Sequence, residues 1–192
     1  MRLPVRITYA NVVSSLALFV ALGGTSVAVI SSQTSGRCSG HARDCSGQKL
    51  DGRDFSRTDL TRSTWDRASL TGASFEGSDL YGSSFDSADL ARANLSHGNR
   101  TQAVFRNANM QGANLRSGDF WGSDLRGADL RGATFNGTKM DRTDLSGANL
   151  KGATIRNSSF YDVHLCRTID TDGTVRNDDC GGVSGGSSGT IP

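Results

Sequence analysis

A large apolar residue recurs at every fifth position between Leu50 and Leu165. The spacing holds at 23 of 24 positions, and Arg100 is the exception. A period of five fits neither the 3.6-residue period of a helix nor the two-residue period of a strand. The pattern therefore predicts an internal repeat. The apolar positions are Leu50, Phe55, Leu60, Trp65, Leu70, Phe75, Leu80, Phe85, Leu90, Leu95, Phe105, Met110, Leu115, Phe120, Leu125, Leu130, Phe135, Met140, Leu145, Leu150, Ile155, Phe160 and Leu165.

The other positions of the repeat share this period. Two residues before the large one, the residue is usually Ala and otherwise mostly Ser or Thr. One residue before it, Asp or Asn is common, and two residues after it Gly recurs. Because Gly and Asn tolerate a positive φ, we expect the chain to turn a corner once in every repeat.

This pattern resembles the A-(D/N)-L-x-x motif of the pentapeptide-repeat family. The closest matches include Ala88-Asp89-Leu90, Ala108-Asn109-Met110, Ala128-Asp129-Leu130 and Ala148-Asn149-Leu150. The resemblance covers about 120 of the 192 residues. It implies an all-β fold, a right-handed quadrilateral β-helix with one pentapeptide on each side and about six coils.

Physical chemistry agrees with such a solenoid. One short repeat cannot bury its apolar side chain, but stacked coils bury a continuous column. We expect the large and the small residue to point inward, and the coils to stack about 4.8 Å apart with backbone pairing between them. Six coils would then extend for roughly 29 Å.

The first residues have a different character. Arg2 and Arg6 are the only charges before an apolar stretch from Ala10 to Ile30, and Ser26-Val27-Ala28 has the small-x-small form of a signal-peptidase site. These features predict a signal peptide over residues 1–28 and hence a secreted or cell-surface protein. The alternative is an uncleaved N-terminal apolar helix, since residues 10–30 could span a membrane and anchor the protein there.

Segments on either side of the repeat carry the four cysteines. Residues 29–47 form a linker and N-terminal cap, residues 48–165 the β-helix, residues 166–180 a C-terminal cap, and residues 181–192 a flexible Gly/Ser tail. An even number of cysteines suits an oxidising compartment. Because the two ends of the solenoid lie farther apart than a disulfide can reach, we expect the pairs Cys38–Cys45 and Cys166–Cys180.

No residue pattern indicates catalysis, a cofactor or a metal centre. The recurring Asp residues can bond nearby backbone at turns, which explains them better than acid–base chemistry does. The cysteine and histidine clusters hold too few ligands for a closed zinc site. Residues 168–175 are expected to form a hairpin or loop, and a calcium loop using Asp170, Asp172, Asp178 and Asp179 is the alternative. The sequence therefore predicts a protein that is not an enzyme.

Arg100 is the one repeat irregularity. Leu95 and Phe105 keep the register around it, so no residue is inserted. Because an unpaired buried guanidinium is costly, we expect Arg100 to turn outward where the wall opens near Gly98. It would then mark a bulge or a contact point, or a tolerated defect.

Three aromatic residues occupy the outward position of one side. With four repeats in a coil, residues 20 apart share a side, and Tyr81, Trp121 and Tyr161 fall on alternate coils about 9.6 Å apart. This row is a candidate interaction face for a protein, a glycan or another copy. The alternative is that the rings pack across coils and protect the ladder.

The balance of charge in the repeat distinguishes an interaction protein from a mimic of DNA. The repeat carries 15 basic and 14 acidic residues, too balanced to imitate DNA or to bind it. We therefore expect an exported, non-enzymatic protein that presents a rigid surface to an unknown protein or cell-surface partner, with no nucleic acid. The alternative, which the family resemblance supplies, is a cytoplasmic DNA mimic that regulates DNA gyrase. The sequence leaves the oligomeric state open.

Overall fold

The computed structural model describes residues 44–177 and residue 180. The predicted signal peptide or anchor helix, most of the linker over residues 29–47 and the Gly/Ser tail lie outside these residues and stay predictions. In the described part of the chain, no helix is long and apolar enough to cross a membrane.

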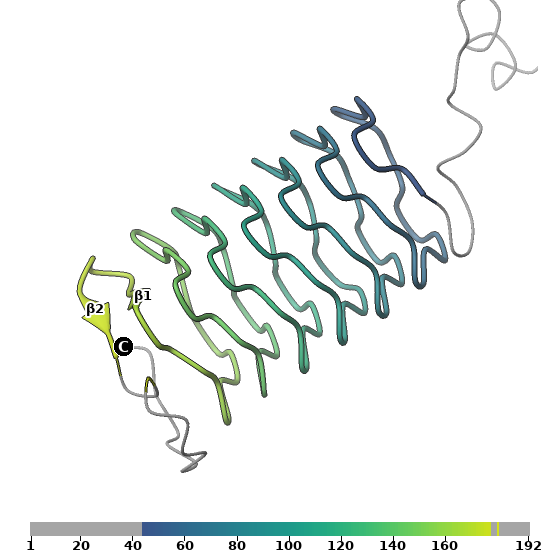
Figure 1. Cartoon of the computed structure of the whole chain (residues 1–192). Coiled ribbons are helices and arrows are strands. Elements are labelled where there is room, and N and C mark those ends of the chain that lie inside the picture. The colour runs from purple at the N-terminus through teal and green to yellow at the C-terminus, as the bar shows by residue number, and fades with distance from the viewer. Residues whose placement is uncertain (1–43, 178–179, 181–192) are drawn as a thin grey trace, which may run out of the picture. The chain divides into compact units, whose positions relative to one another are not determined.

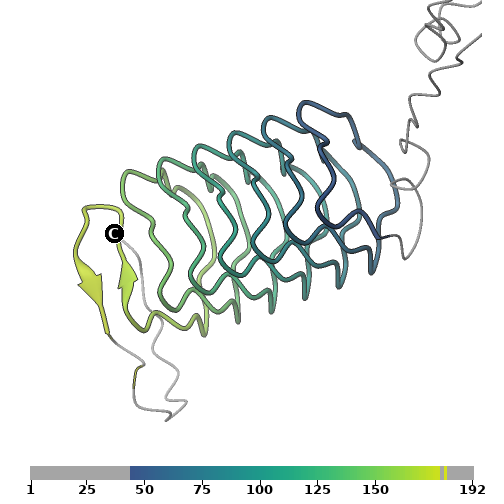
Figure 2. The same ribbon diagram turned by 45° about the horizontal axis from the view of Figure 1, so that its top comes forward.

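The repeat region is a stack of square coils (Figures 1 and 2). Parallel bridges join each residue before a large position to the residue 20 positions later, from Asp44↔Thr64 to Asn149↔Ile169. One coil therefore contains four pentapeptides, and the ladder spans about six coils, as the sequence predicted. Residues 20 apart lie side by side on one face.

Each corner is a tight turn. The N–H three residues after most large positions donates to the carbonyl of the large residue, as from Arg53 to Leu50. The residue two after the large one has a φ between 52° and 72° at every repeat from Gly47 to Arg167. A positive φ at the third residue of such a turn is the type II pattern. The prediction of one corner in each repeat is confirmed, although residues such as Arg62 share the position with Gly.

Four columns of side chains fill the interior. The apolar residues at the repeat positions from Leu60 to Leu150 are all completely buried. Stacked neighbours in a column touch: the rings of Trp65 and Phe85 lie 5.8 Å apart, and those of Phe85 and Phe105 lie 5.0 Å apart. Cys45 extends a column by one repeat beyond the predicted start at Leu50. The interior is therefore one continuous apolar core.

Hydroxyl groups at the small position satisfy carbonyl groups inside the core. Thr143 donates to the carbonyl oxygen of Phe120 at 3.0 Å, Thr138 donates to that of Leu115 at 2.9 Å, and Thr168 donates to that of Leu145 at 2.7 Å. Each donor lies 23 residues after its acceptor, on the next coil. A small polar residue therefore fits the narrow interior without leaving its hydroxyl unpaired.

The β-helix ends with an antiparallel hairpin. Strand β1 (Thr168–Ile169) pairs with strand β2 (Val175–Arg176), which confirms the hairpin expected over residues 168–175. Ile169 still accepts the N–H of Leu150, so one face gains a further layer before the chain reverses. Ile155 and Phe160, under the reversal, are only partly buried.

Candidate interaction surface

The predicted aromatic row lies along one side of the coil, here called the aromatic face. The ladder Asp79↔Asn99↔Asp119↔Lys139↔Ser159 fixes its register, so Tyr81, Trp121 and Tyr161 share a face on alternate coils. The aromatic face comprises residues 59–62, 79–82, 99–102, 119–122, 139–142 and 159–162.

The three rings differ in exposure. Tyr161 is 61% exposed and Trp121 is 39% exposed, whereas Tyr81 is half-buried and its hydroxyl donates to Gln102 Oε1 at 2.9 Å. The guanidinium of Arg142 lies 5.5 Å from the centre of the Trp121 ring, within the range of a cation–π contact. Contacts between coils therefore cover part of the Tyr81 and Trp121 side chains, whereas most of the Tyr161 side chain is free to contact another molecule.

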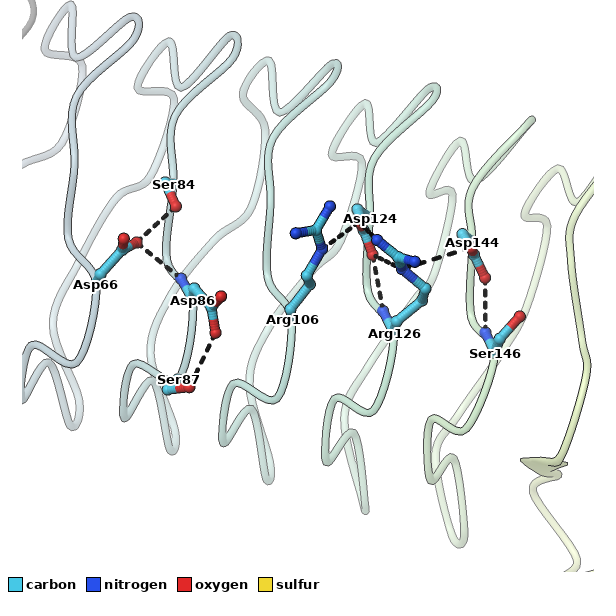
Figure 3. A network of polar contacts seen from close by, with 9 residues as sticks. All are labelled: Asp66, Ser84, Asp86, Ser87, Arg106, Asp124, Arg126, Asp144 and Ser146. Atoms are coloured by element: carbon cyan, nitrogen blue, oxygen red, sulfur yellow. Dashed lines mark hydrogen bonds and ion pairs between the residues drawn. The ribbon is translucent and has the colours of Figure 1, made fainter.

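A second face carries a ladder of charges, here called the ion-pair face (Figure 3). Arg106, on the preceding coil, and Arg126, two residues after Asp124 on the same coil, both contact Asp124, at 2.6 Å and 2.7 Å. Arg126 also lies 3.7 Å from Asp144 on the following coil. These contacts pair the charges of the later coils, whereas Asp66 and Asp86 on the earlier coils accept hydrogen bonds from hydroxyl and backbone groups. The ion-pair face comprises residues 64–67, 84–87, 104–107, 124–127 and 144–147.

The ion pairs explain the pKa shifts on this part of the surface. Burial on its own raises the pKa of Asp124, but the hydrogen bonds from Arg126 and Arg106 outweigh it and hold that pKa below its ordinary value. On the adjoining face, the hydrogen bond from Arg131 lowers the pKa of Asp129. Both carboxylates are therefore held in the charged form as structural ion pairs, which is the opposite of what a general acid at neutral pH needs.

The recurring Asp and Asn side chains fix the turns, as the sequence predicted. Fourteen of them accept the backbone N–H two residues later; Asp79, for example, accepts from Tyr81 at 3.0 Å. Within residues 44–177 and at 180, no group of three or more His, Cys, Asp and Glu side chains could hold a metal ion. His97 is exposed.

The proposed calcium loop involves Asp178 and Asp179, which lie outside the described residues. Asp170 is 4% exposed and contacts Arg176 at 3.2 Å. It occupies a repeat position where the earlier coils carry Leu or Met, so it closes that column with an ion pair.

The position of Arg100 contradicts the prediction that its side chain turns outward. Its side chain is completely buried in the column between Leu80 and Phe120. One guanidinium nitrogen, Nη2, donates to the Phe75 carbonyl oxygen at 2.7 Å, while Nε and Nη1 have no partner. Burial lowers the pKa of Arg100 to about 10, and the charge of Asp79 acts in the opposite direction.

Gly98 gives the physical reason for this difference. A Cβ at residue 98 would lie 1.8 Å from Nη1 of Arg100 and 2.3 Å from the backbone oxygen of Ser78. The missing side chain therefore makes room inside the column rather than opening the wall. Gly118 plays the same part beside Phe120, since a Cβ there would lie 2.8 Å from the ring. The signal in the sequence was Gly at the small position, two residues before an unusually large or charged residue.

The cysteine predictions have separate outcomes. The predicted pair Cys166–Cys180 forms a disulfide with Cα atoms 4.8 Å apart, and it ties the end of the hairpin to the last coil. Cys45 is buried at the first described coil. Cys38 lies outside the described residues, so the pair Cys38–Cys45 stays a prediction.

Comparisons with known proteins agree with this architecture. A family model described as "Pentapeptide repeat region" matches residues 68–145, and one described as "Pentapeptide repeats (8 copies)" matches residues 49–86. Among curated proteins, none matches the sequence.

Solved structures of repeat proteins are also similar. A pentapeptide repeat protein from the Arabidopsis thaliana thylakoid lumen is 32% identical, with 68% of this chain and 86% of that chain covered and a TM-score of 0.39. The pentapeptide repeat protein Rfr23 from the cyanobacterium Cyanothece 51142 is 29% identical, with 61% and 90% covered and a TM-score of 0.41. QnrB1, a plasmid-mediated fluoroquinolone resistance protein, is 23% identical, with 68% and 74% covered and a TM-score of 0.30. Because the two family models together match residues 49–145, about half of the chain, we conclude that this chain belongs to the pentapeptide-repeat family.

Proposed function

We propose that the protein is exported and acts without catalysis, as a rigid support that presents the aromatic face to a protein partner at or beyond the cell surface. The observation that carries the proposal is the exposure of Trp121 and Tyr161, at 39% and 61%, on a backbone held by the ladder. Trp and Tyr are the residues that most often dominate the binding free energy of protein interfaces.

The rigidity of the face supports this role. Residues 119, 139 and 159 are bridged in one continuous ladder, so the positions of Trp121 and Tyr161 are fixed relative to each other. A partner would therefore meet two preplaced rings, and binding would cost little ordering of the backbone. The face carries Lys139–Asp119 and Arg142–Asp162 pairs at 3.6 Å and 3.8 Å, which provide a polar rim.

The C-terminal disulfide supports export. Disulfides persist in oxidising compartments and are uncommon in the cytosol. The apolar start of the chain, with Ser26-Val27-Ala28 after it, supports the same location. A cytoplasmic regulator of DNA gyrase would instead present dense negative charge, whereas Arg106, Arg126 and Arg131 pair with Asp124 and Asp129 on the surface of this chain.

The test combines location with binding. Cell fractionation and sequencing of the mature N-terminus should find the protein outside the cytoplasm, starting near Val29. Immobilised protein should then retain a partner from the cell-surface fraction, and a variant with Tyr81, Trp121 and Tyr161 changed to Ser should lose it while keeping its circular dichroism spectrum. In the matched control variant, Thr71, Gln111 and Lys151 are changed to Ser instead. These residues hold the same repeat position on another face. Cytoplasmic retention, or equal capture by the aromatic variant, would contradict the proposal.

A further inference from the structure

One stretch of the solenoid surface has no acidic residue. It is the side that follows Ala93, Ala113, Ala133 and Ala153 on four consecutive coils, and its outward residues are Asn, Ser, Thr, His, Gly and Arg. The three other faces of the same coils each carry carboxylates. We call this surface the arginine strip. It comprises residues 94–97, 114–117, 134–137 and 154–157.

The two arginines of the strip differ from their equivalents elsewhere. Arg116 and Arg156 are exposed and stand at the position directly after the large residue. At the same repeat position on other faces, Arg106, Arg126 and Arg131 each contact an Asp at 2.6–2.7 Å. Among the described residues, neither Arg116 nor Arg156 forms an ion pair. Their positive charges are therefore available to an external anion.

Hydrogen-bonding groups lie beside these charges. Thr134 and Thr154 occupy the bridged position of the strip and point outward, and within the described part their hydroxyls have no hydrogen-bond partner. Asn114 donates from Nδ2 to Asn94 Oδ1 at 3.1 Å, and Asn94 donates from Nδ2 to Glu76 Oε2 at 3.2 Å on the coil before the strip, so one N–H of each amide is left unused. The strip thus offers a hydroxyl on the coil between the two guanidinium groups, a second hydroxyl beside Arg156, and an amide beside Arg116.

The spacing indicates what kind of anion fits. Arg116 and Arg156 are separated by two coils, or about 9.6 Å along the stack. This is about the length of two sugar rings in an extended polysaccharide. Nucleic acid carries one phosphate for each ~3.4 Å of a strand, a much denser array of charge. The strip also has no aromatic ring on which a base could stack.

We propose that the arginine strip binds an extended acidic polysaccharide with one carboxylate for every two sugar rings. Arg116 and Arg156 pair with successive carboxylates, since guanidinium groups bind carboxylates through two parallel hydrogen bonds. Thr134, Thr154 and the Asn side chains bond the hydroxyls of the sugars between them. This site is separate from the aromatic face, so it does not depend on the function proposed above.

The experiment measures binding of the full chain to hyaluronan, which has one carboxylate per disaccharide, by surface plasmon resonance at two salt concentrations. Hyaluronan should bind, and more weakly at higher salt because the contacts are ionic. The double variant Arg116→Gln with Arg156→Gln should bind roughly tenfold more weakly. The matched control, Arg126→Gln with Arg131→Gln, removes the same total charge from paired arginines and should bind within about twofold of the wild type.

Three further arms complete the test. Thr154→Glu, which places a carboxylate beside Arg156, should weaken binding as the double variant does. Neutral dextran and a single-stranded oligonucleotide should bind more weakly than hyaluronan. Absence of hyaluronan binding, equal losses in the two double variants, or stronger binding of dextran or the oligonucleotide would each overturn the proposal. Circular dichroism confirms that every variant is folded.

Discussion

Replacing the buried Arg100 by Met should make the protein more stable. In the folded chain, burial lowers the pKa of Arg100 from its ordinary value to about 10, and at about 1.4 kcal/mol for each pKa unit this corresponds to about 3 kcal/mol of unfavourable burial. The Phe75 carbonyl that Arg100 contacts keeps a hydrogen bond from the Ser78 hydroxyl at 2.7 Å, so the substitution leaves no orphan acceptor. Met is already accommodated in this column at Met140.

The gain is smaller than the full cost of burial. The shorter Met side chain leaves part of the guanidinium space empty beside Gly98, which costs about 1 kcal/mol. We therefore expect Arg100→Met to raise the free energy of unfolding by about 2 kcal/mol at pH 7, within the range found when buried charges are replaced by apolar residues. Urea unfolding followed by circular dichroism measures this difference, with Arg116→Met as the control on the surface.

The pH dependence of this difference supplies a second readout. Because the pKa of Arg100 is lowered in the folded state, the unfolded chain binds its proton more tightly between about pH 10 and the ordinary pKa of arginine. The wild type should therefore gain stability relative to Arg100→Met as the pH rises through that window. The advantage of Met should be complete below pH 9 and shrink above about pH 10. A variant less stable than the wild type at pH 7 by more than about 1 kcal/mol would refute the reasoning.

Three other predictions concern the corners, the C-terminal cap and the ion pairs. Arg67 has a φ of 57°, so Arg67→Gly should stabilise the fold by up to about 1 kcal/mol. Gly72 has a φ of 66°, so Gly72→Ala should destabilise the fold by about 1 kcal/mol. Thermal unfolding shows whether the two changes have these opposite signs. Changing Cys166 and Cys180 to Ser opens a loop with a sequence separation of 14 and should destabilise the C-terminal cap by up to about 3 kcal/mol. Hydrogen exchange should then become faster in β1 and β2 alone, and unchanged exchange would argue against a stabilising role of the disulfide. Because the hydrogen bond from Arg131 lowers the pKa of Asp129, the stability that this carboxylate contributes is present above about pH 4 and lost as the pH falls further. Asp129→Asn should therefore flatten the acidic part of the curve of stability against pH. An unchanged curve would contradict the pairing of Asp129 with Arg131.

The repeat made the fold predictable from the sequence. Each pentapeptide repeats the same local pattern, so the inward position of Leu90 or Leu130 and the corner two residues later follow from the period. The 20-residue coil was implied by the resemblance to the pentapeptide-repeat family. The turn role of Asp79 and its equivalents was also predictable, because a short polar side chain before a corner reaches the backbone. The pairing of Cys166 with Cys180 followed from the distance between the two ends.

Departures from the repeat were harder to predict. Arg100 was expected outside because the penalty for an unpaired buried charge is large, yet the ladder fixes the direction of every repeat position more strongly than one side chain can change it. The role of Gly98 becomes clear only from its close approach to Arg100 and to the backbone of Ser78 on the preceding coil. The partial burial of Tyr81 and Trp121 also has a nonlocal cause, since Gln102 and Arg142, which contact these two rings, come from neighbouring coils.

The distance between residues 80 positions apart tests the central claim most directly. If four pentapeptides make one coil, Thr71 and Lys151 lie on one face, four coils apart, at about 19 Å between backbone atoms. Spin labels on cysteines introduced at these two positions should give a narrow distance distribution centred near this value, widened by the label arms. A distribution centred beyond about 35 Å, or one as broad as that of an unstructured chain, would contradict the 20-residue coil and every face assigned from it.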